Sequence, residues 1–110
     1  MKKILVTGAA GQIGSDLVPA LRERYGFSNV LAAGFETSLP EEMRDGGPFT
    51  TVDVTNFSQI NEVIKKYQIN TIFHMSSILS ALAEEDRRRA HLVNIDGLFN
   101  ILESALGNGV

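Results

Sequence analysis

The sequence predicts an α/β fold, a doubly wound parallel sheet with helices on both faces. Short apolar runs without a helical period alternate with segments whose apolar residues recur at helical spacing, which is typical of strand–helix–strand units. A glycine-rich corner, residues 8–14, joins the first run to the first helical segment. Four strands connected by right-handed crossovers give the order 3-2-1-4. The sheet is expected to be truncated after the fourth strand and its helix, which leaves an open edge.

The first strand, residues 3–6, leads into three glycines spaced three apart: Gly8, Gly11 and Gly14. The first helix is expected over Gln12–Tyr25, so the glycines form a strand-to-helix corner. Such a corner directs free backbone N–H groups and the positive end of the helix dipole at one point, which suits a pyrophosphate. Glycine is needed where a Cβ would block the turn, the phosphate or the helix packing. The alternative is an ordinary glycine-rich turn.

The first helix contains Pro19 and is expected to end at Gly26. The second strand, residues 30–33, ends at Gly34, where dinucleotide-binding folds usually place an acidic residue for the adenosine ribose. Glu36 either reaches back to the ribose or is a solvated charge. No arginine follows the strand closely to receive a 2′-phosphate, which favours NAD over NADP.

Residues 35–48 are interpreted as a loop with a helical turn at 41–44, and residues 49–54 as the third strand. The next helix is capped by Thr55 or Asn56. Its apolar face comprises Ile60, Val63, Ile64 and Tyr67. Asp53 stands at the carboxyl edge of the sheet, where it either accepts a hydrogen bond from an adenine amino group or stabilises the turn.

The fourth strand, residues 71–76, contains His74, which we interpret as a packed core residue. Ser76 and Ser77 end this strand on the same edge as the glycine corner, where a nicotinamide ribose would pass. The last helix begins in the charged run 84–89, a solvated face, and continues to about Leu106. Within this helix, Asn94 either faces the cofactor or is merely exposed.

The composition of the chain excludes several classes of function and partner. The 110 residues suffice for one domain, with 44% hydrophobic residues to form a core, and no second domain is expected. A net charge of −3 argues against nucleic acid as a partner. With no cysteine, disulfides and thiolate metal sites are excluded. We expect a cytoplasmic protein, because no apolar run is long enough to span a bilayer and no signal peptide is evident.

Four motifs together resemble the extended short-chain dehydrogenase/reductases, a group that includes nucleotide-sugar epimerases and dehydratases. They are Thr7-Gly8-x-x-Gly11-x-x-Gly14, Asp53-Val54-Thr55, the run 72–77 and Val93-Asn94-x-x-Gly97. The resemblance implies an NAD(P)-binding Rossmann fold. Within the group, residues 11–14, 17–22 and 78–81 most resemble the L-threonine 3-dehydrogenases built on the epimerase plan. The match spans the whole chain but only the N-terminal, cofactor-binding portion of such an enzyme.

The resemblance also implies roles for individual residues. The pyrophosphate would lie on Gly8, Gly11, Gln12, Ile13 and Gly14, the adenine on Asp53 and Val54, and the nicotinamide side on Met75, Ser76, Ser77 and Asn94. Ser80 would contact the substrate. Gly34 occupies the ribose position without the family's acidic side chain, and Ser76-Ser77 replaces a small apolar pair.

The family's catalytic motif is missing from this sequence. Such enzymes remove a hydroxyl proton with the tyrosine of Tyr-x-x-x-Lys, but Tyr25 is followed at that spacing by Asn29 and Tyr67 by Thr71. No catalytic residue is therefore assigned, and the chain alone is expected to be inactive.

The expected function is the NAD-binding part of an L-threonine 3-dehydrogenase, which oxidises L-threonine to 2-amino-3-oxobutanoate with NAD. The alternatives are a nucleotide-sugar epimerase or dehydratase and a non-catalytic NAD-binding sensor module. L-Threonine would bind only together with the missing C-terminal part. The open sheet edge and the family's dimers lead us to expect a homo-oligomer.

Overall fold

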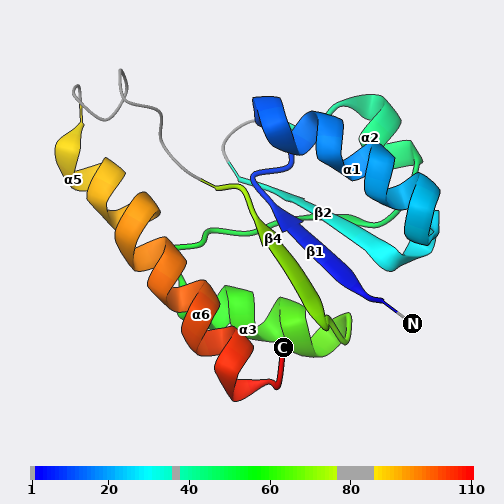
Figure 1. Cartoon of the computed structure of the whole chain (residues 1–110). Helices are drawn as coiled ribbons and strands as arrows, with labels where there is room; N and C mark the ends of the chain where they lie inside the picture. Colours follow the sequence, from blue (N-terminus) through cyan, green and yellow to red (C-terminus); the bar gives the residue numbers. More distant parts are fainter. Residues whose placement is uncertain (1, 36–37, 77–85) are drawn as a thin grey trace.

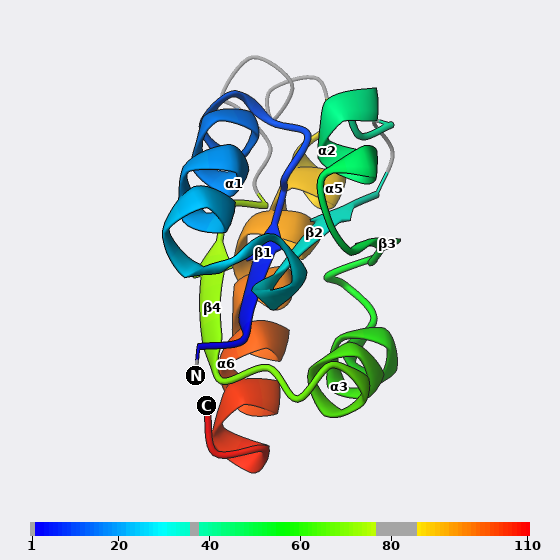
Figure 2. The same cartoon turned by 90° about the vertical axis from the view of Figure 1, so that its right-hand side faces the viewer.

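The computed structural model describes residues 2–35, 38–76 and 86–110. Four parallel strands form one sheet in the order β3-β2-β1-β4; Figure 1 shows β2, β1 and β4, and Figure 2 also shows β3. The strands are β1 (Ile4–Thr7), β2 (Val30–Gly34), β3 (Phe49–Thr51) and β4 (Thr71–His74). This topology confirms the predicted fold class and strand order, and it places the carboxyl ends of all four strands at one edge.

Helices cover the sheet on both faces. The helices α1 (Gln12–Tyr25) and α2 (Glu41–Asp45) lie on one face, and α3 (Phe57–Lys66) and α6 (Gly97–Gly107) lie on the other (Figures 1 and 2). Successive side chains of β1 point to opposite faces, as the pleat of a strand requires. Ile4 and Val6 pack with α1 and α2, whereas Leu5 packs with α3 and α6.

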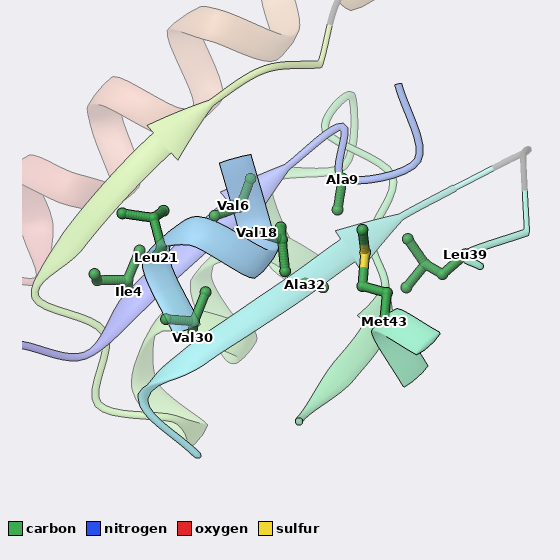
Figure 3. Packing of buried hydrophobic residues seen from close by; sticks show 9 residues of the cluster. All are labelled: Ile4, Val6, Ala9, Val18, Leu21, Val30, Ala32, Leu39 and Met43. Carbon is green, nitrogen blue, oxygen red and sulfur yellow. The ribbon is translucent and has the colours of Figure 1, made fainter. Parts of the chain in front are cut away.

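Each face has its own apolar core. Val18 and Leu21 of α1 pack over β1 and β2, and Met43 of α2 joins them beside Ala32 (Figure 3). On the opposite face, Ile60 and Ile64 of α3 and Ile101 of α6 pack against the sheet; the remaining members are Leu5, Leu31, Ala33, Val52, Val54 and Ile69. β1 and β2 are therefore covered on both sides, as their continuous apolar runs predicted, whereas β4 is half-buried and β3 is largely exposed.

Helix α1 has the predicted bounds. It continues through the exposed Pro19 and stops at Gly26, whose φ of 102° is accessible mainly to glycine. A short 3-10 helix, η1 (Phe27–Asn29), follows and was not predicted. The cap of α3 is Asn56, whose side chain accepts a hydrogen bond from the Gln59 N–H, so the structure selects one of the two predicted caps.

Two strands are shorter than predicted. β3 ends at Thr51 and β4 at His74, although one more backbone bond continues each line: Val52 N–H donates to Gly34 O at 2.8 Å and Met75 N–H to Thr7 O at 3.2 Å. Beyond these bonds the chain turns away from the sheet. Met75 and Ser76, which follow β4, lie beside Gly8 of the glycine corner.

The last helix is divided into three segments. α5 (Arg87–His91) begins at Asp86, whose carboxylate caps the Arg89 N–H, and passes into a π-helical segment, η2 (Leu92–Asp96), before α6. At the start of α6, a Cβ on Gly97 would lie 2.7 Å from Val54 Cγ2. Glycine there lets the helix lie directly against Val54, in the turn after β3.

Arg22 is a buried charge in α1 that sequence analysis did not single out. Only 3% of its surface is exposed, and its guanidinium donates hydrogen bonds to the backbone oxygens of Val30, Met43 and Pro48. Burial lowers the pKa of Arg22 from its ordinary value. The side chain ties α1 to the start of β2 and to the segment between α2 and β3.

Candidate functional site

The glycine corner forms a tight loop at the carboxyl end of β1. Gly8 has a φ of +63°, and its carbonyl accepts the Gly11 N–H at 3.0 Å. Ala9 N–H donates to Ala33 O at 3.0 Å, which attaches the loop to the end of β2. Gly11 is the N-cap of α1, so the first amides of the helix have no carbonyl one turn earlier to bind. The corner can therefore bind an anion.

The three glycines are required for different reasons. A Cβ on Gly8 would lie 2.6 Å from the carbonyl carbon of Met75, and one on Gly14 would lie 2.3 Å from Gly8 O. Both positions are crowded by the protein's own backbone. A Cβ on Gly11 would meet only Gly8 O, at 3.2 Å, and Gly11 is exposed like its neighbours Gln12 and Ile13. Gly11 is therefore the least crowded of the three positions, although a Cβ there would still displace Gly8 O by a few tenths of an ångström.

The end of β2 lies beside a pocket of about 180 Å³. Its lining includes Gly34 and Arg44, together with hydroxyl-bearing Ser38, Thr50 and Thr51; Phe35, Leu39 and Phe49 complete it. Sequence analysis found no arginine close after β2. The fold nevertheless brings Arg44 of α2 to this pocket, so a cation lies near the position expected for the ribose. Glu36 lies outside the described residues.

Asp53 and Val54, predicted within the third strand, lie in the turn that follows the shorter β3. Asp53 Oδ1 accepts hydrogen bonds from Thr55 N (2.9 Å) and Thr55 Oγ1 (2.6 Å), the geometry of an aspartate that stabilises a turn. The turn role is thus observed, and adenine contact stays a prediction. The Val54 side chain is buried, and Val54 O accepts the Asn100 side-chain amide at 3.0 Å.

The segment after β4 lies directly against the glycine corner. Met75 and Ser76 follow His74, and the Met75 peptide lies against Gly8. His74 is half-buried and not simply packed: its Nδ1 lies 2.7 Å from Thr7 Oγ1, a partner that sequence analysis missed. Burial lowers the pKa of His74, which favours the neutral imidazole. Asn94 is half-buried on η2, while Ser77 and Ser80 lie outside the described residues.

No site for a metal ion is evident in the part of the chain that the structure describes, where no group of three or more acidic or histidine side chains converges. Over the same ranges, none of the helices combines the length and apolarity needed to cross a bilayer.

A parallel sheet of order 3-2-1-4 with a glycine corner at its first strand–helix junction defines the Rossmann class of α/β folds. Comparison with known proteins makes this more specific. The model of the NAD dependent epimerase/dehydratase family matches residues 4–110, so the chain belongs to that family.

Similar proteins fall within the same group. An uncharacterized epimerase/dehydratase of Staphylococcus epidermidis is 44% identical over 105 residues, which is 96% of this chain and 33% of that protein. Among solved structures, an L-threonine dehydrogenase of Clostridium difficile superimposes with a TM-score of 0.93 at 43% identity, over 99% of this chain and 34% of that one.

A UDP-glucose 4-epimerase of Thermus thermophilus, solved in complex with NAD, gives a TM-score of 0.86 at 28% identity, over 100% of this chain and 35% of that one. The chain thus spans about a third of the length of the relatives it matches. These comparisons support membership of an NAD-binding superfamily.

Proposed function

We propose that the corner at residues 8–14 binds NAD through its diphosphate. The observation that carries the proposal is the contrast among the three glycines. Gly8 and Gly14 are fixed by close contacts within the protein, whereas at Gly11 a side chain would project from the cap of α1 into the space where a phosphate would approach. The amides of Gln12 and Ile13 would hold the phosphate oxygens, while Gly11, whose own N–H is donated to Gly8 O, would let the phosphate approach.

The other predicted residues are assigned to the rest of the dinucleotide. Asp53 and Val54 would lie at the adenine, Gly34 at the ribose, and Met75, Ser76, Ser77 and Asn94 on the nicotinamide side. When bound, NAD accepts a hydride at the nicotinamide ring from the carbon that bears the substrate hydroxyl. The described residues bind and orient the dinucleotide, and among them none is assigned a proton transfer.

For the whole protein we propose an L-threonine 3-dehydrogenase, with Ser80 at the substrate. Support comes from the high similarity to the Clostridium difficile L-threonine dehydrogenase and from the residues 78–81 that resemble such enzymes. The second candidate is a nucleotide-sugar epimerase or dehydratase, supported by the superposition on the Thermus thermophilus epimerase. A sensor module that binds NAD without catalysis is the third.

The 110 residues contain no Tyr-x-x-x-Lys. We therefore propose that this chain alone binds NAD but does not oxidise L-threonine, because no side chain is available in the family's position to take the hydroxyl proton. NADH formation from L-threonine and NAD by the purified chain would contradict this.

We also propose that the protein is cytoplasmic and self-associates. Helix α6 and the preceding η2 expose a series of large apolar side chains at helical spacing: Leu92, Ile95, Leu98, Phe99, Leu102 and Leu106. An apolar surface of this kind is typical of an interface.

The test of NAD binding is calorimetric titration of the chain and of two variants that add the same charge. In Gly11→Asp the new carboxylate caps α1 and competes for the amides that would hold the phosphate. In Gly107→Asp it projects from a position with no atom within 4 Å. We expect saturable binding by the wild type, a loss of roughly 10- to 100-fold in Gly11→Asp, and wild-type affinity in Gly107→Asp. Equal affinities in the two variants would refute the proposed site.

A further inference from the structure

The hydroxyl of Thr7 is the centre of a small hydrogen-bond cluster at the carboxyl end of the sheet. Thr7 is 1% exposed and is the register partner of His74 on the neighbouring strand. Its Oγ1 lies 2.7 Å from His74 Nδ1, 3.0 Å from Met75 N and 3.3 Å from Ser76 N. One oxygen thus connects β1 to three consecutive residues at the end of β4.

The donor and acceptor capacities of this oxygen determine which ring nitrogen of His74 carries the proton. A hydroxyl has two lone pairs and one proton, and the amides of Met75 and Ser76 can only donate. The Ser76 N–H and the Met75 N–H, which is shared between Thr7 Oγ1 and Thr7 O, take the lone pairs, so the hydroxyl proton is directed at His74 Nδ1. The ring nitrogen Nδ1 therefore accepts, and the ring proton is on Nε2.

A ring protonated at Nδ1 would bring a third donor to the same oxygen. The cluster therefore requires a neutral imidazole in a single tautomer. Burial of His74, which lowers its pKa, favours the same neutral form.

The cluster lies directly behind the glycine corner. Gly8 follows Thr7 in the chain, and its α-carbon is so close to the next strand that an added Cβ would lie 2.6 Å from the carbonyl oxygen of Met75 and 2.7 Å from Ser76 N. The backbone of Gly8 and the Met75–Ser76 peptide are therefore in contact. Any shift of residues 75–76 must also shift the corner.

We propose that Thr7 and His74 are a positioning pair, which holds residues 75–76 against the glycine corner and so fixes the nicotinamide side of the site relative to the diphosphate side. The pair acts through Gly8, Met75 and Ser76 and does not touch the dinucleotide. This inference rests on the proposed function, because the two sides are those of an NAD site.

The first test measures the tautomer in the unliganded protein. The chain has two histidines, His74 and His91, so a long-range ¹H–¹⁵N correlation spectrum contains only two imidazole rings, and His91→Gln assigns them. We expect His74 at neutral pH to show an unprotonated Nδ1 and a protonated Nε2. A proton on Nδ1, or a doubly protonated ring, would overturn the proposal whether or not the protein binds NAD.

The second test measures NAD affinity in matched variants. Thr7→Val and His74→Leu each remove the hydrogen bond while roughly keeping the side-chain volume. By contrast, Thr7→Ser keeps the hydroxyl donor, and His74→Asn keeps an acceptor. We expect losses of roughly 3- to 10-fold in the first two variants and affinities within about 2-fold of wild type in the other two. Unchanged affinity in Thr7→Val, or equal losses in Thr7→Val and Thr7→Ser, would refute the pair.

Backbone amide shifts give a readout of the same variants without NAD. In Thr7→Val the amides of Gly8, Met75 and Ser76 should shift, and in Thr7→Ser they should stay near their wild-type positions. If the wild type fails to bind NAD but these shifts and the tautomer are as expected, the proposed function fails and the positioning of residues 75–76 stands. If NAD binds but the shifts are absent, only the pair fails.

Discussion

Gly14 is the glycine at which an added methyl group should have the clearest steric effect on the stability of the fold. It lies in the first turn of α1 and is buried against the corner. A Cβ at this position would lie 2.3 Å from Gly8 O and 2.9 Å from the Cα of Ala9, both backbone atoms. No side-chain rotation can relieve such contacts.

The magnitude follows from the displacement that Gly14→Ala would require. Ordinary contact distances of about 3.5 Å demand that the start of α1 move away from the loop by roughly 1 Å. Overpacking of this kind costs about 1–3 kcal/mol, and the better helix propensity of alanine returns up to about 1 kcal/mol. With the full return, the net loss in the free energy of unfolding is about 0–2 kcal/mol, and we expect a value near the middle of this range, about 1 kcal/mol. The displaced amides should also lower NAD affinity by at least about tenfold.

Urea denaturation and calorimetric titration measure these two quantities. The matched control is Gly107→Ala, since a Cβ on Gly107 of α6 meets no atom within 4 Å. The control should lose neither stability nor affinity. If Gly14→Ala unfolds at the wild-type urea concentration and binds NAD as the wild type does, the steric reasoning about the corner is wrong.

Three further predictions concern Arg22, His74 and Gly34. Arg22→Met should lower the free energy of unfolding, measured by urea titration, by about 2–3 kcal/mol, because the carbonyls of Val30, Met43 and Pro48 lose their buried donor. The control is Arg24→Met, at an exposed position, which should change the free energy of unfolding by less than about 0.5 kcal/mol. Because burial lowers the pKa of His74, the unfolded chain binds a proton more readily than the folded chain does. The free energy of unfolding should therefore fall as the pH drops below about 6.5, and its slope against pH should be smaller in His74→Asn. Equal slopes in the wild type and the variant would contradict this. Gly34→Asp should raise the affinity for NAD relative to NADP by about tenfold in parallel titrations. The new carboxylate would accept hydrogen bonds from the ribose hydroxyls and would repel a 2′-phosphate. An unchanged ratio of the two affinities would mean that the ribose binds elsewhere.

Local sequence signals were sufficient for much of the fold. The bounds of α1 follow from the corner before it and from Gly26 after it, and the cap of α3 is narrowed to Thr55 or Asn56, of which the structure selects Asn56. These features depend on residues within a few positions of one another. The strand order also follows from sequence, because alternating strands and helices leave few topologies once crossovers are right-handed.

Contacts between distant residues account for what sequence analysis missed. Arg22 shares the buried face of α1 with Val18 and Leu21, but a charged side chain gives no local signal of burial, and only the carbonyls of Val30, Met43 and Pro48 make its burial favourable. His74 lies in an apolar run, but its hydroxyl partner is 67 positions away. The shortened ends of β3 and β4 and the π-helical segment η2 likewise depend on tertiary packing, which no local pattern encodes.

In the candidate site, too, some features could be predicted from local sequence and others depend on contacts between distant residues. The glycines of the corner could be found from their spacing alone, and the structure explains which of them the protein itself requires. Arg44 could not be associated with Gly34, because ten residues and a helical turn separate them in sequence while one pocket brings them together.

The central claim is that the backbone amides of the glycine corner hold the diphosphate of NAD. The most direct measurement is a titration of the ¹⁵N-labelled chain with NAD, followed through its amide resonances. We expect the largest shifts on Gly8, Gly11, Gln12, Ile13 and Gly14, and we expect ADP, which shares the diphosphate, to shift the same amides. A folded chain in which these five amides stay unmoved while NAD binds elsewhere, or in which NAD causes no shift at all, would contradict it.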